Sequence, residues 1–169
     1  MRSLFPDRGG AFADPRSETP AVTVVAFTVF GLAAPAGSKR ALPAGGRPGA
    51  RPIIVDDSKR SRPWKRQVAQ VAGTTMMSRP LLDGPLELHV VFYVPRPKGH
   101  YGTGRNAGTV KASAPAWPTV KPDLTKLVRA VEDAMTGIVW RDDSQIVKQV
   151  VTKKYTTEAA RCVVGVGSV

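Results

Sequence analysis

This chain of 169 residues is organised around the stretch KPDLTKLVRAVEDAMTGIVWRDDSQIVKQVVTK, residues 121–153. The first half of this stretch predicts a helix, because apolar side chains recur at spacings of three and four and therefore share one helical face. The expected buried face consists of Leu124, Leu127, Val128, Val131, Ala134 and Met135. The expected solvent face consists of Thr125, Arg129, Asp133 and Thr136. Gly137 suits the end of the helix, where a left-handed backbone conformation favours glycine.

Three aspartates flank this expected helix. Asp123 opens it, and Asp142 with Asp143 precede a β-branched run over residues 146–152. These carboxylates could converge on one point and hold a divalent cation, because hard cations prefer oxygen ligands. The same residues also fit a plainer interpretation, in which Asp123 caps the helix and Asp142, Asp143 and Ser144 form a turn.

The chain is strongly basic, with 25 Lys and Arg residues against 13 Asp and Glu residues and a net charge of +12. Such a surface favours a polyanionic partner, of which nucleic acid is the commonest, although a solvated basic surface that aids solubility is the alternative. Much of the charge falls in two glycine- and proline-rich regions, residues 39–66 and 95–120. The basic residues expected to contact DNA phosphates are Lys39, Arg40, Arg60, Lys65, Arg66, Arg96 and Lys98.

Cysteine content and hydropathy indicate the compartment. Cys162 is the single cysteine of the sequence, so neither a disulfide framework nor a cysteine zinc site is expected. The apolar segment 22–36 falls short of the roughly 18 residues that a membrane span needs. We therefore expect a cytoplasmic protein without a membrane segment.

The order of the expected elements predicts an α+β fold, a small mixed sheet with two main helices packed on one face. The expected strands are residues 21–30, 86–94, 146–152 and 160–166, and the expected helices begin at Ser61 and Asp123. The first strand is dense in β-branched and aromatic residues and is expected to be buried on both faces. Residues 1–20 are expected to form a flexible tail, and residues 21–169 a single domain. The glycine-rich segment 95–120 is expected to be a long loop without regular structure.

Residues 121–147 resemble the signature of RusA-type Holliday-junction resolvases, small endodeoxyribonucleases common in phages and prophages. That signature runs Pro-Asp-x-Asp-Asn/Lys-Leu-x-Lys/Arg, then an acid within the helix, then Trp/Tyr-x-Asp-Asp-x-Gln-Val. The upstream motif GLAAPAGSKR, residues 31–40, and the basic helix after it resemble the N-terminal half of the family less specifically.

The resemblance implies a homodimeric, Mg²⁺-dependent endonuclease, with Mn²⁺ as a possible substitute, that resolves four-way DNA junctions by paired phosphodiester hydrolysis. It implies that Asp123 is the first metal-binding acid, that Asp143 is the last, and that Asp142 precedes it. Arg129 stands where the family has a cation required for catalysis, and Asp133 matches another acid of the helix.

Thr125 departs from the family pattern, which has an acid at this position. A hydroxyl can coordinate Mg²⁺ but brings no charge and a weaker bond. Three explanations stay open: a metal site completed by another residue, a reduced activity, or an inactive protein that still binds DNA junctions. An RNA target is a further alternative, although the chain lacks the aromatic-rich strand motif of common RNA-binding sheets.

Overall fold

The computed structural model describes residues 23–37, 39–42, 53–56 and 60–169. The tail expected over residues 1–20 lies outside them, so its flexibility stays a prediction. The strands are β1 Thr23–Phe30, β2 Lys39–Leu42, β3 Ile53–Asp56, β4 Leu86–Pro95, β5 Ile146–Thr156 and β6 Arg161–Ser168. The helices are α1 Ser61–Met76 and α2 Leu124–Met135, with 3-10 turns η1 Lys98–His100, η2 Gly104–Asn106 and η3 Asp143–Gln145.

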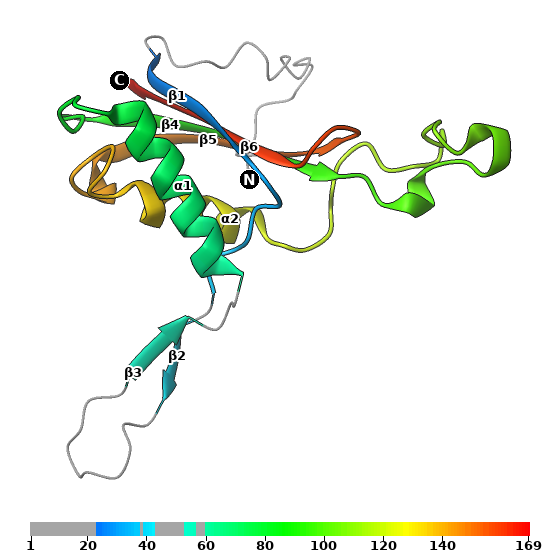
Figure 1. Cartoon of the computed structure of the whole chain (residues 1–169), viewed down its shortest axis with the longest axis horizontal. Helices are drawn as coiled ribbons and strands as arrows, with labels where there is room; N and C mark the ends of the chain where they lie inside the picture. Colours follow the sequence, from blue (N-terminus) through cyan, green and yellow to red (C-terminus); the bar gives the residue numbers. More distant parts are fainter. Residues whose placement is uncertain (1–22, 38, 43–52, 57–59) are drawn as a thin grey trace, which may run out of the picture.

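Four strands form one mixed sheet in the order β1-β6-β4-β5. The β1–β6 and β4–β6 pairs are antiparallel, whereas β4 and β5 run parallel. A parallel pair needs a long crossover connection, and here the crossover carries the segment 96–120, α2 and η3. Both helices lie on the same side of the sheet (Figure 1). The predicted α+β fold with a small mixed sheet and two helices is confirmed.

The hydrophobic core lies between this sheet and the helices. Along β4 the side chains alternate, so Leu88, Val90 and Phe92 are fully buried and point toward the helices. The expectation that the first strand is buried on both faces is wrong. Val25 and Val29 are buried, whereas the Phe30 side chain is 61% exposed, because no helix within the described ranges covers the second face of the sheet.

Helix α1 continues through Gly73 to Met76. Trp64, Val68, Ala72 and Met76 recur every four residues and are buried, so this apolar stripe holds the helix against the core through its last turn. Gly73 lies inside the helix, with nothing within 4 Å of the position that a Cβ would occupy.

Helix α2 matches its predicted amphipathic pattern. Leu127, Val128, Val131, Ala134 and Met135 are buried, and the four residues assigned to the solvent face are exposed. Immediately after the helix, Gly137 adopts φ +79°, the left-handed conformation that the sequence predicted at this end.

The two basic regions contain more regular structure than expected. β2 and β3 pair antiparallel within the region expected to be loop. The segment 96–120 contains η1, η2 and an antiparallel bridge between Tyr101 and Val110. It projects beyond the sheet as an arm (Figure 1), closed by the hydrogen bonds that Lys111 N donates to His100 O at 2.9 Å and Gly102 N to Thr109 O at 3.0 Å. Among the described residues, no helix has the length and apolar character needed to cross a membrane.

Candidate active site

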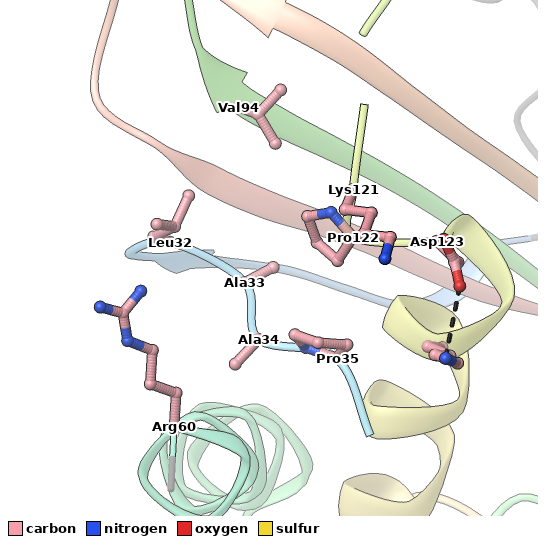
Figure 2. A pocket seen from close by; sticks show the side chains of 10 residues that line it. Leu32, Ala33, Ala34, Pro35, Arg60, Val94, Lys121, Pro122 and Asp123 are labelled. Atoms are coloured by element: carbon pink, nitrogen blue, oxygen red, sulfur yellow. Dashed lines mark ion pairs between the residues drawn. The ribbon is translucent and has the colours of Figure 1, made fainter. Parts of the chain in front are cut away.

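Asp123 occupies the position immediately before α2, in an extended conformation with φ −68° and ψ 139°. Its carboxylate makes no capping hydrogen bond to the helix. Instead it is exposed and pairs with the ammonium of Lys126 at 3.4 Å (Figure 2). The interpretation of Asp123 as a side-chain helix cap is therefore wrong. No backbone N–H of the helix binds the carboxylate, whose side-chain contact is the ion pair with Lys126.

Asp142 and Asp143 form a tight acidic corner between α2 and β5. Asp142 caps η3: its Oδ1 accepts from Ser144 N at 2.9 Å, and the Gln145 side chain accepts from Asp142 N in return. Hydrogen bonds from the side chain and backbone of Ser144 hold the pKa of Asp142 below its usual range. The turn interpretation thus describes part of what Asp142 does, while one of its oxygens stays outside the cap. Asp143 is exposed beside it.

The acidic corner is anchored to the rest of the fold. Gln145 Nε2 donates to Leu82 O at 3.1 Å and to Gly84 O at 3.3 Å, which ties η3 to the loop before β4. Trp140 is fully buried, and its Nε1 donates to Thr136 Oγ1 at 3.2 Å. Contacts of this kind fix the direction in which the aspartates leave the backbone.

The acids at the two ends of α2 do not converge within one chain. Asp123 precedes the helix and the acidic corner follows it, and twelve helical residues span about 18 Å. Helix α2 also runs antiparallel to β5, because Glu132 in its last turn contacts Gln149 while Pro122 before it contacts Lys153. The described residues contain no group of three or more His, Cys, Asp or Glu side chains that could hold a metal ion. The expectation that the three aspartates meet in a single folded chain is therefore wrong.

Glu132 is a residue of this site that the sequence interpretation missed. Its side chain is half-buried between α2 and β5 and accepts a hydrogen bond from Gln149. Burial raises the pKa of Glu132, the negative charges of Asp143 and Asp133 raise it further, and Arg129 acts in the opposite direction. Glu132 and Asp143 are therefore close enough for their charges to interact. In the sequence, Glu132 directly follows Val131, a residue of the apolar face of the helix. This position at the border of the apolar face was the signal that could have identified Glu132.

Arg129 and Thr125 lie on the exposed face of α2, four residues apart. Residues at this spacing are neighbours on a helix surface. The cation expected for catalysis therefore lies between the two acidic ends of the helix, within electrostatic reach of Glu132.

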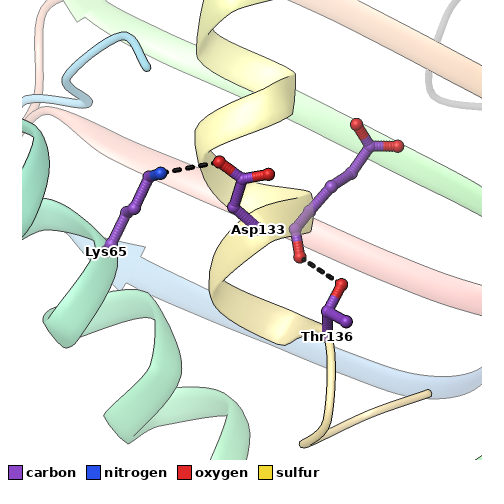
Figure 3. Close-up of polar contacts among 4 residues, drawn as sticks. Lys65, Asp133 and Thr136 are labelled. Atoms are coloured by element: carbon purple, nitrogen blue, oxygen red, sulfur yellow. Dashed lines mark hydrogen bonds and ion pairs between the residues drawn. The ribbon is translucent and has the colours of Figure 1, made fainter. Parts of the chain in front are cut away.

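The residues expected to bind DNA differ in their availability. Lys65 donates to Asp133 Oδ2 at 2.6 Å, an ion pair that joins α1 to α2 (Figure 3). Arg96 lies 4.5 Å from the centre of the Tyr155 ring and donates to Pro115 O at 2.8 Å, so it holds the arm against β5. Arg60, Arg66 and Lys98 are exposed. Lys39 and Arg40 belong to β2, but their side chains lie outside the described part of the structure.

A family model and a bacterial protein are both similar to this chain. The family model described as endodeoxyribonuclease RusA matches residues 42–167. The chain is also similar to the uncharacterized protein YqaN of Bacillus subtilis (strain 168), with 31% identity over 136 residues, 79% of this chain and 89% of that protein. The matched residues include α1, the arm, α2 and the acidic corner.

Proposed function

Because the chain belongs to the RusA endodeoxyribonuclease family, we propose that it resolves four-way DNA junctions by metal-dependent phosphodiester hydrolysis. The observation that carries this proposal is the family match over residues 42–167, which includes both ends of α2. The three acids at these ends are exposed, as side chains must be if they bind a hydrated cation next to a DNA strand. They are Asp123, Asp142 and Asp143.

We propose Asp123, Asp142 and Asp143 as metal ligands, with Thr125 as a weaker fourth. Their donor atoms are all oxygens, which suits Mg²⁺ or Mn²⁺ better than a softer metal. When bound, such an ion polarises the phosphodiester and lowers the pKa of a bound water. The cap on Asp142 supports this role, because hydrogen bonds from Ser144 keep that carboxylate ionised and fixed in direction.

Arg129 supplies the positive charge that phosphodiester cleavage requires. It is exposed on the same helical face as Thr125, so a phosphate that lies along this face meets its guanidinium. A fixed cation stabilises the negative charge that develops on the phosphate oxygens during cleavage.

The separation of the acids favours a site built from two copies of the chain. A twofold axis that sets the α2 helices of two copies antiparallel brings Asp123 beside the partner subunit's Asp143, and the same contact recurs on the other side. Such a homodimer has two metal sites, which matches the two strands that must be cut in a symmetric four-way junction. A single copy has the acids about one helix length apart and makes no such site.

The exposed basic residues supply affinity for branched DNA. Arg60, Arg66 and Lys98 are exposed and can neutralise phosphates, and every neutralised phosphate releases counterions. Contacts of this kind position a protein on DNA without reading bases. We therefore propose recognition of the junction by shape. Lys65 is a weaker candidate because Asp133 already neutralises it.

The test is cleavage of a labelled synthetic four-way junction by the wild-type protein and by Asp143→Asn, with Mg²⁺ or Mn²⁺ present. We expect paired nicks from the wild type and at least about a hundredfold slower cleavage by the variant, because removing a charged ligand weakens the metal site. Junction affinity in EDTA should change little. Glu158→Gln is the matched control, since Glu158 is an exposed acid that pairs with Arg161 away from α2. An Asp143→Asn protein that cuts at the wild-type rate would disprove the assignment.

Thr125 favours a second candidate, a protein that binds junctions but no longer cuts them. In this case the wild-type chain retards the junction in a gel and produces no nicks with either metal. The two candidates are thus separated by the same assay.

A further inference from the structure

A cleft of about 460 Å³ opens beside Asp123, in the size range of sites that bind small molecules. Its lining residues are Leu32, Ala33, Ala34, Pro35, Arg60, Val94, Lys121, Pro122, Asp123 and Lys126. We call it the Asp123 cleft. Figure 2 shows Arg60 on one side and Lys121, Pro122 and Asp123 on the other, with Ala33, Ala34 and Pro35 between them. A second hollow of about 330 Å³ shares Leu32, Val94, Lys121 and Pro122 with it and extends toward Val120 and Tyr155.

The walls of the Asp123 cleft are fixed by hydrogen bonds from neighbouring elements. Lys153 Nζ donates to Val120 O at 2.7 Å and to Pro122 O at 2.9 Å, which holds the wall before α2 against β5. Ala36 N donates to Lys126 O at 2.8 Å, which joins the lining segment Ala33, Ala34 and Pro35 to α2. The cleft is therefore formed before any ligand arrives, which reduces the ordering cost of binding.

The cleft combines an apolar floor with a basic rim. Leu32, Val94 and Pro122 supply apolar surface, while Arg60, Lys121 and Lys126 stand against the single acid Asp123. Leu32 is 57% exposed and Val120 in the adjoining hollow is 61% exposed. Large apolar side chains that gather around a hollow with a charged rim are typical of a binding site. The ligand that fits is a flat apolar group attached to an anion.

We propose that the Asp123 cleft binds one unstacked nucleotide at the branch point of the DNA, with its base on the apolar floor and its phosphate at the lysines. This inference rests on the proposed function, because Asp123 is also the proposed metal ligand. The base would enter between Leu32 and Pro122, and its phosphate would meet Lys121 and Lys126 close to the strand to be cut. An unstacked base costs least where pairing is already interrupted, as it is at a branch.

The experiment uses the full-length protein and a four-way junction with 2-aminopurine beside the branch point, in EDTA so that no strand is cut. Emission from this base increases when it leaves the stack. We expect saturating wild-type protein to raise the emission about threefold or more, and Leu32→Gln to remove at least about half of that rise. Val120→Gln tests the adjoining hollow in the same way. Both side chains are more than half exposed, so neither change should disturb folding.

Met77→Gln is the matched control, because Met77 is 81% exposed at the end of α1 and does not line the cleft. A wild-type protein that cuts junctions without raising the emission overturns this inference and leaves the proposed function intact. Emission that rises equally with all variants also overturns it, since the base then unstacks elsewhere. A protein that neither binds nor cuts junctions overturns both. If Leu32→Gln converts dimers to monomers in sedimentation velocity, the cleft accommodates a second copy of the chain, and the nucleotide assignment is wrong.

Discussion

Thr125 is the residue at which this chain departs from the signature of its family, and the structure shows that it is exposed on the first turn of α2. An aspartate at this position would add a charged ligand two residues after Asp123. We predict that Thr125→Asp lowers the half-saturating Mg²⁺ concentration for junction cleavage by about tenfold, because carboxylate charge sets the affinity of such sites.

The matched control for this change is Thr74→Asp, at an exposed threonine on the other helix, α1. If Thr125→Asp alters neither the metal dependence nor the rate, Thr125 does not contribute to the metal site, and its difference from the family has no catalytic consequence.

Glu87 provides a pH-dependent contribution to stability that is separate from the acidic site. It is buried, and its Oε1 accepts from His89 Nε2 at 2.6 Å and from Lys148 Nζ at 2.8 Å. The hydrogen bond from Lys148, followed by that from His89, lowers the pKa of Glu87, and burial opposes them without prevailing. The folded state therefore favours the ionised carboxylate.

Since the pKa of Glu87 is lower in the folded chain than in the unfolded chain, its stabilisation is present above the unfolded value, about 4.3, and is lost as the pH falls through the folded value. We predict that Glu87→Gln lowers the urea midpoint at pH 7. The difference from wild type should shrink steadily below about pH 4. A difference that is constant between pH 7 and pH 3 would contradict this account.

At the scale of the elements, the end of α2 depends on one backbone conformation. Gly137 has φ +79°, and no atom lies within 4 Å of the position that a Cβ would occupy. Substitution is therefore opposed by backbone strain and not by a clash. We predict that Gly137→Ala lowers the free energy of unfolding by about 1 kcal/mol, measured by urea denaturation.

Gly73 supplies a control of opposite sign. It lies inside α1 with the same empty space around its Cβ position but without a positive φ. Gly73→Ala should raise the free energy of unfolding by about 0.5–1 kcal/mol, because alanine loses less conformational entropy in a helix. Equal effects of the two changes would show that the left-handed conformation at Gly137 carries no cost.

The sequence predicted the elements well where periodicity was strong. The 3.6-residue pattern of α2 correctly assigned its buried face, because the helix borders the core directly. The pattern failed for the first strand. Its run of apolar residues suggested burial on two faces, but only the register against β6 and the helices decides which of Val25 and Phe30 is covered. A short segment of sequence does not specify tertiary packing of this kind.

The sequence singled out the candidate acids, whose role as metal ligands stays a prediction, but it did not give their geometry. The sequence indicated Asp123, Asp142 and Asp143, yet it could not show that α2 runs antiparallel to β5 and thereby separates them. The same arrangement brings Glu132 close enough to Asp143 for the negative charge of Asp143 to raise the pKa of Glu132. Proximity of this kind depends on the path of the crossover that joins β4 to β5, and a short sequence motif does not specify that path.

At the scale of the whole molecule, the proposed site shared between two subunits makes a sharp prediction. Asp123→Asn and Asp143→Asn proteins should each be inactive alone. Mixed and refolded together, half of the dimers pair one variant with the other, and each such dimer regains one intact site. We therefore predict recovery of about one quarter of the wild-type number of sites, with single nicks instead of paired cuts. A site contained in one subunit would give no recovery, because every copy then lacks one ligand.

The position of β6 in the sheet has a consequence for synthesis. β6 lies between β1 and β4 and pairs with both, so the first strand gains its neighbour only when residues 161–168 arrive. In a nascent chain, β1 therefore has no neighbouring strand of this sheet until translation has passed β6, whereas β4 can already pair with β5. Pairings so distant along the chain form slowly. Premature stop codons or frameshifts before residue 161 should thus leave β1 without a neighbouring strand and separate it from the β4–β5 pair.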